Sequence, residues 1–163
     1  MDTFSHALWG LGLFGQRGRA GLALLFGALP DLISFAPFLL WRLVTGRWTP
    51  GKPPLEILPD WLLFNYALGH SALVAGCAVL LLWCWRPELG FVACGWLFHI
   101  VLDFPFHSAD YFPTQLLWPL SDFAFDGIPW SRPWIWYPNL VGVLALLVWR
   151  LGQRRRRRMT GKL

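Results

Sequence analysis

The chain has 163 residues, enough for one domain; 56% of them are hydrophobic, only 14% are charged, and the formal net charge is +5. Soluble domains carry about 25% charged residues, so this composition excludes an ordinary soluble domain and indicates an integral membrane protein. The five arginines at 154–158 form a tail after the last apolar run, with no basic surface beside them, so nucleic acid is excluded as an expected partner.

The first apolar run, residues 3–14, carries His6 near its start. Crossing a hydrocarbon core of about 30 Å takes roughly 20 residues in a helix, so this run is too short to span a membrane. We expect it to form a short interfacial or re-entrant helix.

Four longer apolar runs follow, and they predict an all-α, polytopic helical bundle within residues 1–152. The expected spans cover residues 22–40, 61–85, about 89–105 and 134–151. Pro30 should bend the first span, and Asp31 beside it is an ionisable group at membrane depth. An alternative is that Asp31 only caps the helical half that follows Pro30. The second span is the longest uninterrupted one, and His70 lies within it between Gly69 and Ser71.

Positive charge predicts the topology. Residues 153–163 form a basic tail, which should be cytoplasmic, with its arginines in contact with anionic lipid headgroups. Four spans then place the N-terminus in the cytoplasm too, together with Arg17, Arg19 and Arg86. The loops at 45–60 and 107–133 should lie outside, which describes a multi-pass protein of the inner membrane.

The segment 95–110, GWLFHIVLDFPFHSAD, contains the strongest chemical signal. His99 and Asp103 are four residues apart and therefore lie on one face of a helix. Imidazole and carboxylate together are typical ligands of first-row metal ions, zinc most often. The alternative is a buried His–Asp hydrogen bond that holds two helices together. His107 keeps the same face only if the helix continues past Pro105.

The polar residues of the spans have similar predicted depths. At 1.5 Å per residue, Asp31, His70, His99 and Asp103 all fall in the central to outer part of the bilayer, and His6 could approach from the short N-terminal helix. We therefore predict a metal site with the ligands His6, His70, His99, Asp103 and His107. Asp31 and Asp110 are the expected catalytic carboxylates, because the set exceeds the needs of one ion and some members must act as bases or orient the imidazoles.

Five short motifs together resemble a family of bacterial and archaeal membrane-bound metal-dependent hydrolases. They are the His-Ala-Leu at 6–8 with a glycine at 10, Gly-Ala-Leu-Pro-Asp at 27–31, Gly-His-Ser at 69–71, the HxxxD with its downstream histidine at 99–107, and Trp-Pro-Leu at 118–120. That family is distantly similar to zinc-dependent phospholipases C. The resemblance implies a helical hydrolase acting on phosphoesters or lipids. Residues 33–35, Ile-Ser-Phe, follow Pro-Asp where family members often carry more polar residues, including a further aspartate, and this departure favours one metal ion over two.

We therefore expect a membrane hydrolase that uses a divalent metal ion, zinc first, to activate water against an ester or phosphoester of a lipid or envelope intermediate. A non-catalytic protein that binds or transports metal is one alternative. A membrane scaffold whose polar residues only join helices is another.

Overall fold

The chain folds into six α-helices in the computed structural model, which describes residues 1–16, 18–48 and 51–159, without the side chains of 157 and 158. No strand occurs in these ranges, so the all-α prediction is confirmed for them. Arg17 and the last four residues of the predicted tail lie outside the described residues. The helices are α1 (Thr3–Phe14), α2 (Ala20–Val44), α3 (Asp60–Gly69), α4 (Ala72–Trp85), α5 (Pro87–Asp103) and α6 (Pro133–Met159), with a short 3-10 turn at Leu55–Ile57.

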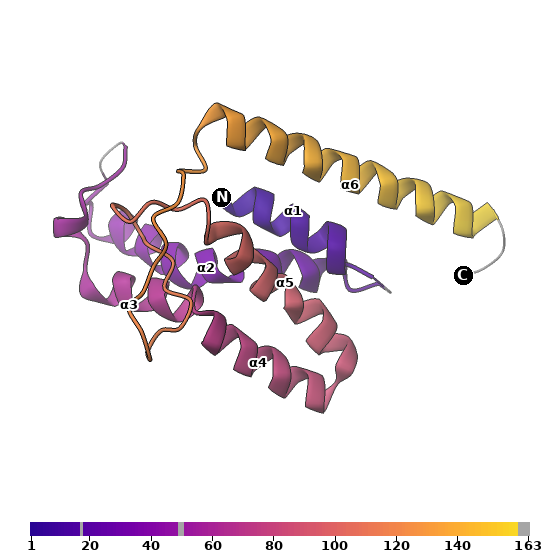
Figure 1. Cartoon of the computed structure of the whole chain (residues 1–163), viewed down its shortest axis with the longest axis horizontal. Coiled ribbons are helices and arrows are strands. Elements are labelled where there is room, and N and C mark those ends of the chain that lie inside the picture. The colour runs from indigo at the N-terminus through magenta and orange to yellow at the C-terminus, as the bar shows by residue number, and fades with distance from the viewer. Residues whose placement is uncertain (17, 49–50, 160–163) are drawn as a thin grey trace.

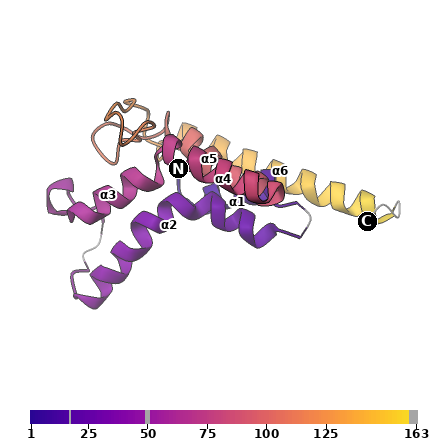
Figure 2. The ribbon, with the colours of Figure 1, turned by 90° about the horizontal axis from the view of Figure 1, so that it is seen from below.

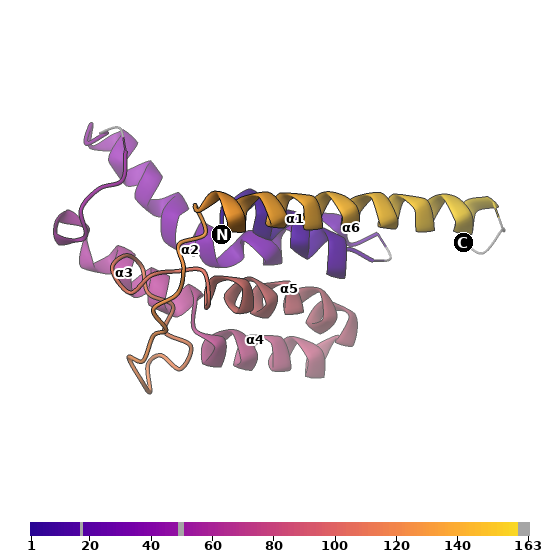
Figure 3. The same cartoon turned by 45° about the horizontal axis from the view of Figure 1, so that its top comes forward.

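The bundle is built around α1, α2 and α5, which pack against one another, while α4 pairs with α5 and α6 lies along α1 (Figures 1 and 3). The predicted N-terminal helix at 3–14 is confirmed to the residue. Asp2 begins it by accepting a hydrogen bond from the Ser5 N–H at 2.9 Å, which satisfies one of the free donors at the helix start. At its other end, the Arg150 guanidinium of α6 donates to the carbonyls of Leu11, Gly12 and Gly15.

Two glycines let α1 and α2 approach closely. A Cβ on Gly10 would lie 2.5 Å from the Ala23 carbonyl oxygen, and a Cβ on Gly27 would lie 2.5 Å from the His6 carbonyl oxygen. Neither distance is tolerable between non-bonded atoms, so larger residues would force the helices apart. The contact places His6 of α1 beside the middle of α2.

Helix α2 is continuous although it contains Pro30 and Pro37. It is bent in its middle, as Pro30 predicts (Figure 2). Pro37 cannot donate to the carbonyl of Ile33, and the side-chain amide of Asn65 in α3 donates to that oxygen instead, at 3.3 Å. Because the helix continues through Asp31, the alternative in which Asp31 caps a second helical half is wrong.

The predicted uninterrupted span at 61–85 is wrong, because it is two helices, α3 and α4, that meet at 54°. The break follows from local hydrogen bonding. His70 ends α3 in a non-helical conformation, and the Ser71 hydroxyl accepts from the Val74 N–H at 3.2 Å to begin α4. The same hydroxyl donates to the Trp118 carbonyl at 2.6 Å, so the break is also tied to the segment after α5.

Two helices in the described ranges, α2 and α6, are long and apolar enough to cross a membrane. The bent α3–α4 pair is a third candidate if its two helices count as one span. Many large apolar side chains of α6 are exposed on the isolated chain, including Val141, Val148 and Trp149. These properties are compatible with a membrane protein. Helix α5 has 17 residues and is shorter than either of those two helices.

Candidate metal centre

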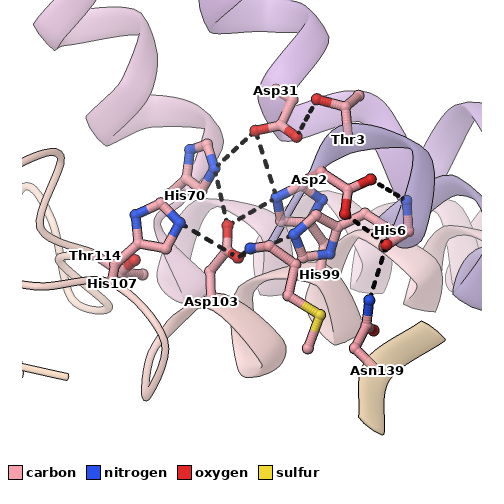
Figure 4. Close-up of polar contacts among 12 residues, drawn as sticks. Asp2, Thr3, His6, Asp31, His70, His99, Asp103, His107, Thr114 and Asn139 are labelled. Carbon is pink, nitrogen blue, oxygen red and sulfur yellow. Dashed lines mark hydrogen bonds and ion pairs between the residues drawn. The ribbon is translucent and has the colours of Figure 1, made fainter. Parts of the chain in front are cut away.

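Four buried side chains from three parts of the fold converge on one point: Asp31 of α2, His70 at the α3–α4 break, and His99 and Asp103 of α5 (Figure 4). One ligand atom from each lies within 4.8 Å of the others, so the group could hold a metal ion. We call these residues the four-residue group. The predicted convergence of Asp31, His70, His99 and Asp103 is therefore confirmed.

The spacing of the four ligand atoms tests whether a metal ion fits. The His99 Nε2 lies 3.1 Å from the Asp103 Oδ2, and the His70 Nε2 lies 3.6 Å from the same oxygen. The Asp31 Oδ1 lies 3.6 Å from the His70 Nε2 and 3.8 Å from the His99 Nε2. Tetrahedral ligands at the usual nitrogen and oxygen distances from zinc are separated by about 3.3 to 3.6 Å. Three of the four spacings exceed a normal hydrogen bond, and all lie near the tetrahedral value.

Hydrogen bonds to backbone carbonyls orient both imidazoles. The Nδ1 of His99 lies 2.7 Å from the Gly27 carbonyl oxygen, and the Nδ1 of His70 lies 3.0 Å from the Tyr66 carbonyl oxygen. A carbonyl only accepts, so each Nδ1 carries the proton, and in the neutral imidazole that binds metal each Nε2 presents a lone pair. Both Nε2 atoms and the Asp103 Oδ2 are buried without a hydrogen-bond partner. Metal-binding histidines are held in this way, and the unpaired atoms face the centre of the four-residue group.

The two carboxylates are oriented from outside the group. Thr3 donates its hydroxyl to the Asp31 Oδ2 at 2.7 Å, which turns Oδ1 toward the histidines. The Oδ1 of Asp103 lies 2.9 Å from the His6 Nε2 and also contacts the Met1 amino group. Two carboxylates and two neutral imidazoles carry a charge of −2, which a divalent ion would neutralise in this buried position.

The remaining predicted residues fall in three different places. His6 is buried and stacks on His99 with ring centroids 3.5 Å apart, but its Nε2 faces the Asp103 oxygen that points away from the four-residue group. The Nε2 of His107 lies 3.5 Å from that same oxygen and is buried without a partner. Asp110 is exposed and, in the described part of the chain, lies outside the four-residue group.

Helix α5 ends at Asp103, so helical geometry does not position His107. Hydrogen bonds from its own Nδ1 hold it instead. Its Nδ1 lies 3.1 Å from the Phe112 carbonyl oxygen and 3.3 Å from the Tyr66 hydroxyl. Phe112 has a φ of +52°, a left-handed conformation that costs an aromatic residue on the order of 1 to 2 kcal/mol. This backbone turns the Phe112 carbonyl toward both His107 and Tyr66, whose hydroxyl donates to it at 2.7 Å.

A cavity of about 660 Å³ adjoins the four-residue group. Asp31 of the four-residue group and the nearby His107 line the cavity. A ligand in the cavity would therefore meet these two side chains before His70, His99 or Asp103. The other described walls of the cavity are mostly apolar and include Phe35, Phe38 and Phe112. The volume is in the range of small-molecule sites.

Sequence reasoning missed several residues that orient the site. Thr3 and Tyr66 could have been found, because they precede His6 by three residues and His70 by four on the same helices and therefore share their faces. Lys52, which lies in the cavity wall, follows no pattern in its loop. Its neighbour Tyr111 donates to the Pro53 carbonyl at 2.9 Å, and burial raises the pKa of that phenol, so it stays protonated as a donor.

No protein-family model matches the chain, and no curated protein and no solved structure matches it.

Proposed function

We propose that this protein is an integral membrane hydrolase in which a divalent metal ion, zinc first, activates water against an ester or phosphoester of a lipid-like substrate. The proposal rests on one observation above all. Two imidazoles with protonated Nδ1 atoms present unpaired Nε2 atoms to two carboxylate oxygens, at nearly tetrahedral spacing, beside a cavity.

The alternative in which these residues only join helices accounts poorly for that geometry. A structural His–Asp pair gains stability from a hydrogen bond of about 2.7 to 3.2 Å. Here the Asp31 oxygen lies 3.6 and 3.8 Å from the two Nε2 atoms, and buried polar atoms without partners are costly. A bound cation would remove that cost.

When bound, the ion would lower the pKa of a coordinated water molecule toward 7 and make hydroxide available at neutral pH. His70, His99 and Asp103 would hold the ion, and Asp31, the fourth member of the group, would lie beside the position left for the water molecule. The Asp31 Oδ1 lies 3.6 and 3.8 Å from the two Nε2 atoms, on average farther than the Asp103 Oδ2, and Asp31 lines the cavity, so it is the carboxylate best placed to accept a proton from water. His107, which lines the same cavity with its Nε2 unpaired, is the group placed to bind or protonate a leaving oxygen.

We further propose four membrane crossings, formed by α2, the bent α3–α4 pair, α5 and α6, with the start of α2 and the basic end of α6 in the cytoplasm. Met1 contacts Asp103 at the opposite end of α5 from the α4–α5 turn, so the N-terminus would lie at the site and not in the cytoplasm as expected from the sequence. The support is the arginine-rich end of α6 and the apolar length of α2, α6 and the α3–α4 pair. Helix α5 has 17 residues, which is at the lower end of the length that spans a bilayer. In this arrangement the exposed apolar side chains of α6 face lipid, and the tail arginines bind anionic headgroups.

Metal content and turnover together test the proposal. The purified protein should contain about one equivalent of a divalent metal ion, and His99→Ala should remove it along with hydrolysis of a chromogenic alkyl phosphodiester. His99→Gln separates the rival functions, because glutamine keeps a hydrogen-bonding group but not the imidazole nitrogen. A wild type without metal or hydrolysis, whose melting temperature is unchanged in His99→Gln, would support a scaffold. Metal binding without any hydrolysis in the wild type would support a storage or transport protein.

A further inference from the structure

The cavity beside the four-residue group combines apolar walls with a single lysine. The rings of Phe35, Phe38, Phe106 and Phe112 lie in its wall, and Lys52 is the one lysine or arginine among the described residues that line it. The carboxylate of Asp2 also belongs to the wall, but it accepts hydrogen bonds from the Ser5 N–H at 2.9 Å and the Ser5 hydroxyl at 2.7 Å. The Met1 amino group is the other cation in the wall, and it pairs with the Asp103 carboxylate. Lys52 is therefore the charged group still available to a ligand.

Lys52 is held in place rather than free in a loop. Its Nζ lies 3.4 Å from the centroid of the Tyr111 ring, an attractive cation–π contact. The hydroxyl of Tyr111 donates to the Pro53 carbonyl and so ties the loop to the segment after α5. In the part of the chain that the structure describes, no carboxylate forms an ion pair with Lys52, which lines the cavity.

The charges and the shape of the cavity indicate which ligand it suits. A divalent ion in the four-residue group would balance its two carboxylates, and the Met1 amino group and the Asp2 carboxylate in the wall offset each other, so Lys52 would leave the lining with a surplus positive charge. An anion is favoured at such a site, and an ammonium binds phosphate oxygens well. The phenylalanine rings favour an apolar chain on the same molecule.

We propose that the cavity binds a phosphate-bearing amphiphile, with its apolar chain against the phenylalanine rings and its phosphate between the Lys52 ammonium and the four-residue group. This inference rests on the proposed function, because it treats the cavity as the substrate site of the hydrolase. It narrows the substrate from any ester to an anionic phosphoester. Lys52 is the residue that determines this specificity.

The test measures binding, so it does not depend on turnover. The metal-loaded protein in a neutral detergent is titrated with radiolabelled decyl phosphate, and unlabelled inorganic phosphate and decyl maltoside serve as competitors. We expect decyl phosphate to bind, inorganic phosphate to displace it only at a far higher concentration, and decyl maltoside not to displace it. Lys52→Gln should weaken decyl phosphate binding roughly tenfold or more, because a charged hydrogen bond is lost.

Two variants control for charge and fold. Lys52→Arg keeps the positive charge and should bind decyl phosphate within about threefold of the wild type. Arg86→Gln removes one positive charge at the α4–α5 turn, at the other end of α5 from the site, and should leave binding unchanged (Figure 1).

Wild-type binding by Lys52→Gln would overturn the inference, and so would inorganic phosphate that binds as tightly as decyl phosphate. Displacement by decyl maltoside would overturn the role of the phosphate. Other outcomes would distinguish a failure of the proposed hydrolase function from a failure of the proposed ligand. If decyl phosphate binding depends on Lys52 but the protein has neither metal nor hydrolytic activity, the proposed hydrolase function is refuted and the proposed ligand is retained. If the protein hydrolyses a neutral ester in a metal-dependent reaction that Lys52→Gln does not affect, the proposed ligand is refuted and the proposed hydrolase function is retained.

Discussion

Asp31 and Asp103 occupy different positions in the four-residue group, and replacing each by asparagine should separate water activation from metal binding. Asp103 is almost completely buried, and both of its oxygens contact imidazole nitrogens. Asp31 lines the cavity, and its second oxygen accepts from the Thr3 hydroxyl. In Asp31→Asn that hydroxyl can accept from the new amide instead, so the side chain should keep its orientation.

The expected magnitudes follow from these contacts. Asp31→Asn keeps an oxygen toward the histidines and should weaken metal affinity by about 10- to 100-fold, as for groups that support a metal site without holding it alone. It removes the base, so turnover should fall by about 10² to 10⁴, or roughly 2.7 to 5.4 kcal/mol in the barrier. Asp103→Asn loses the anionic oxygen 3.1 Å from His99, the closest ligand pair, and should abolish both metal content and turnover.

The assay is metal content at a buffered free zinc concentration, beside turnover of an alkyl phosphodiester at the same concentration. We expect Asp31→Asn to contain metal but turn over slowly, and Asp103→Asn to contain no metal and show no turnover. Equal metal loss in both variants would make Asp31 an ordinary ligand. Unaltered turnover in Asp31→Asn would remove it from the mechanism, and full metal occupancy in Asp103→Asn would refute the proposed ligand set.

Three further outcomes are expected. A single cysteine at Ser121, in a chain whose three native cysteines are replaced, should be labelled only from outside the cell; labelling from the cytoplasm alone would invert the topology. Gly10→Ala should lower the free energy of unfolding by about 1 to 3 kcal/mol, because its Cβ meets the α2 backbone. Gly21→Ala, which has nothing within 4 Å, is its control in the same thermal melt. Arg150→Met should cost about 1 to 3 kcal/mol by leaving carbonyls at the end of α1 unpaired, whereas the exposed Arg155→Met should cost little; equal melting temperatures would contradict the cap.

The sequence predicted the part of the site that lies within one helix and less of what depends on how segments cross. His99 and Asp103 are four residues apart in α5, so their shared face follows from helical geometry. Asp110 was expected near the metal but is exposed, because the chain turns after Asp103 and the helical register ends there. His107 nevertheless returns to the site through its hydrogen bond to Phe112, a contact that no spacing rule contains.

The break at His70 was missed because composition and local geometry conflict there. The run 61–85 is apolar enough for one span, and a single serine within it is compatible with a continuous helix. What decides the structure is the partner of that serine. The Ser71 hydroxyl accepts from α4 and donates to the Trp118 carbonyl, 47 residues along the chain, and only tertiary structure supplies that acceptor.

The small residues of the recognised motifs have a physical role that connects them to the metal ligands. Gly27 lies where α1 crosses α2, and its carbonyl also orients the Nδ1 of His99. Gly69 lies against Pro30 of α2, where a Cβ would be 3.0 Å from the Pro30 carbonyl oxygen, and its own carbonyl accepts from the Trp96 indole at 2.6 Å. Each glycine brings two backbones close enough for a carbonyl of one segment to hold a side chain of another. Gly69, beside His70, and Gly27, one turn before Asp31, therefore set the helix separations at which these ligands reach the centre. A histidine or aspartate placed at the same depth without that close crossing would not reach it.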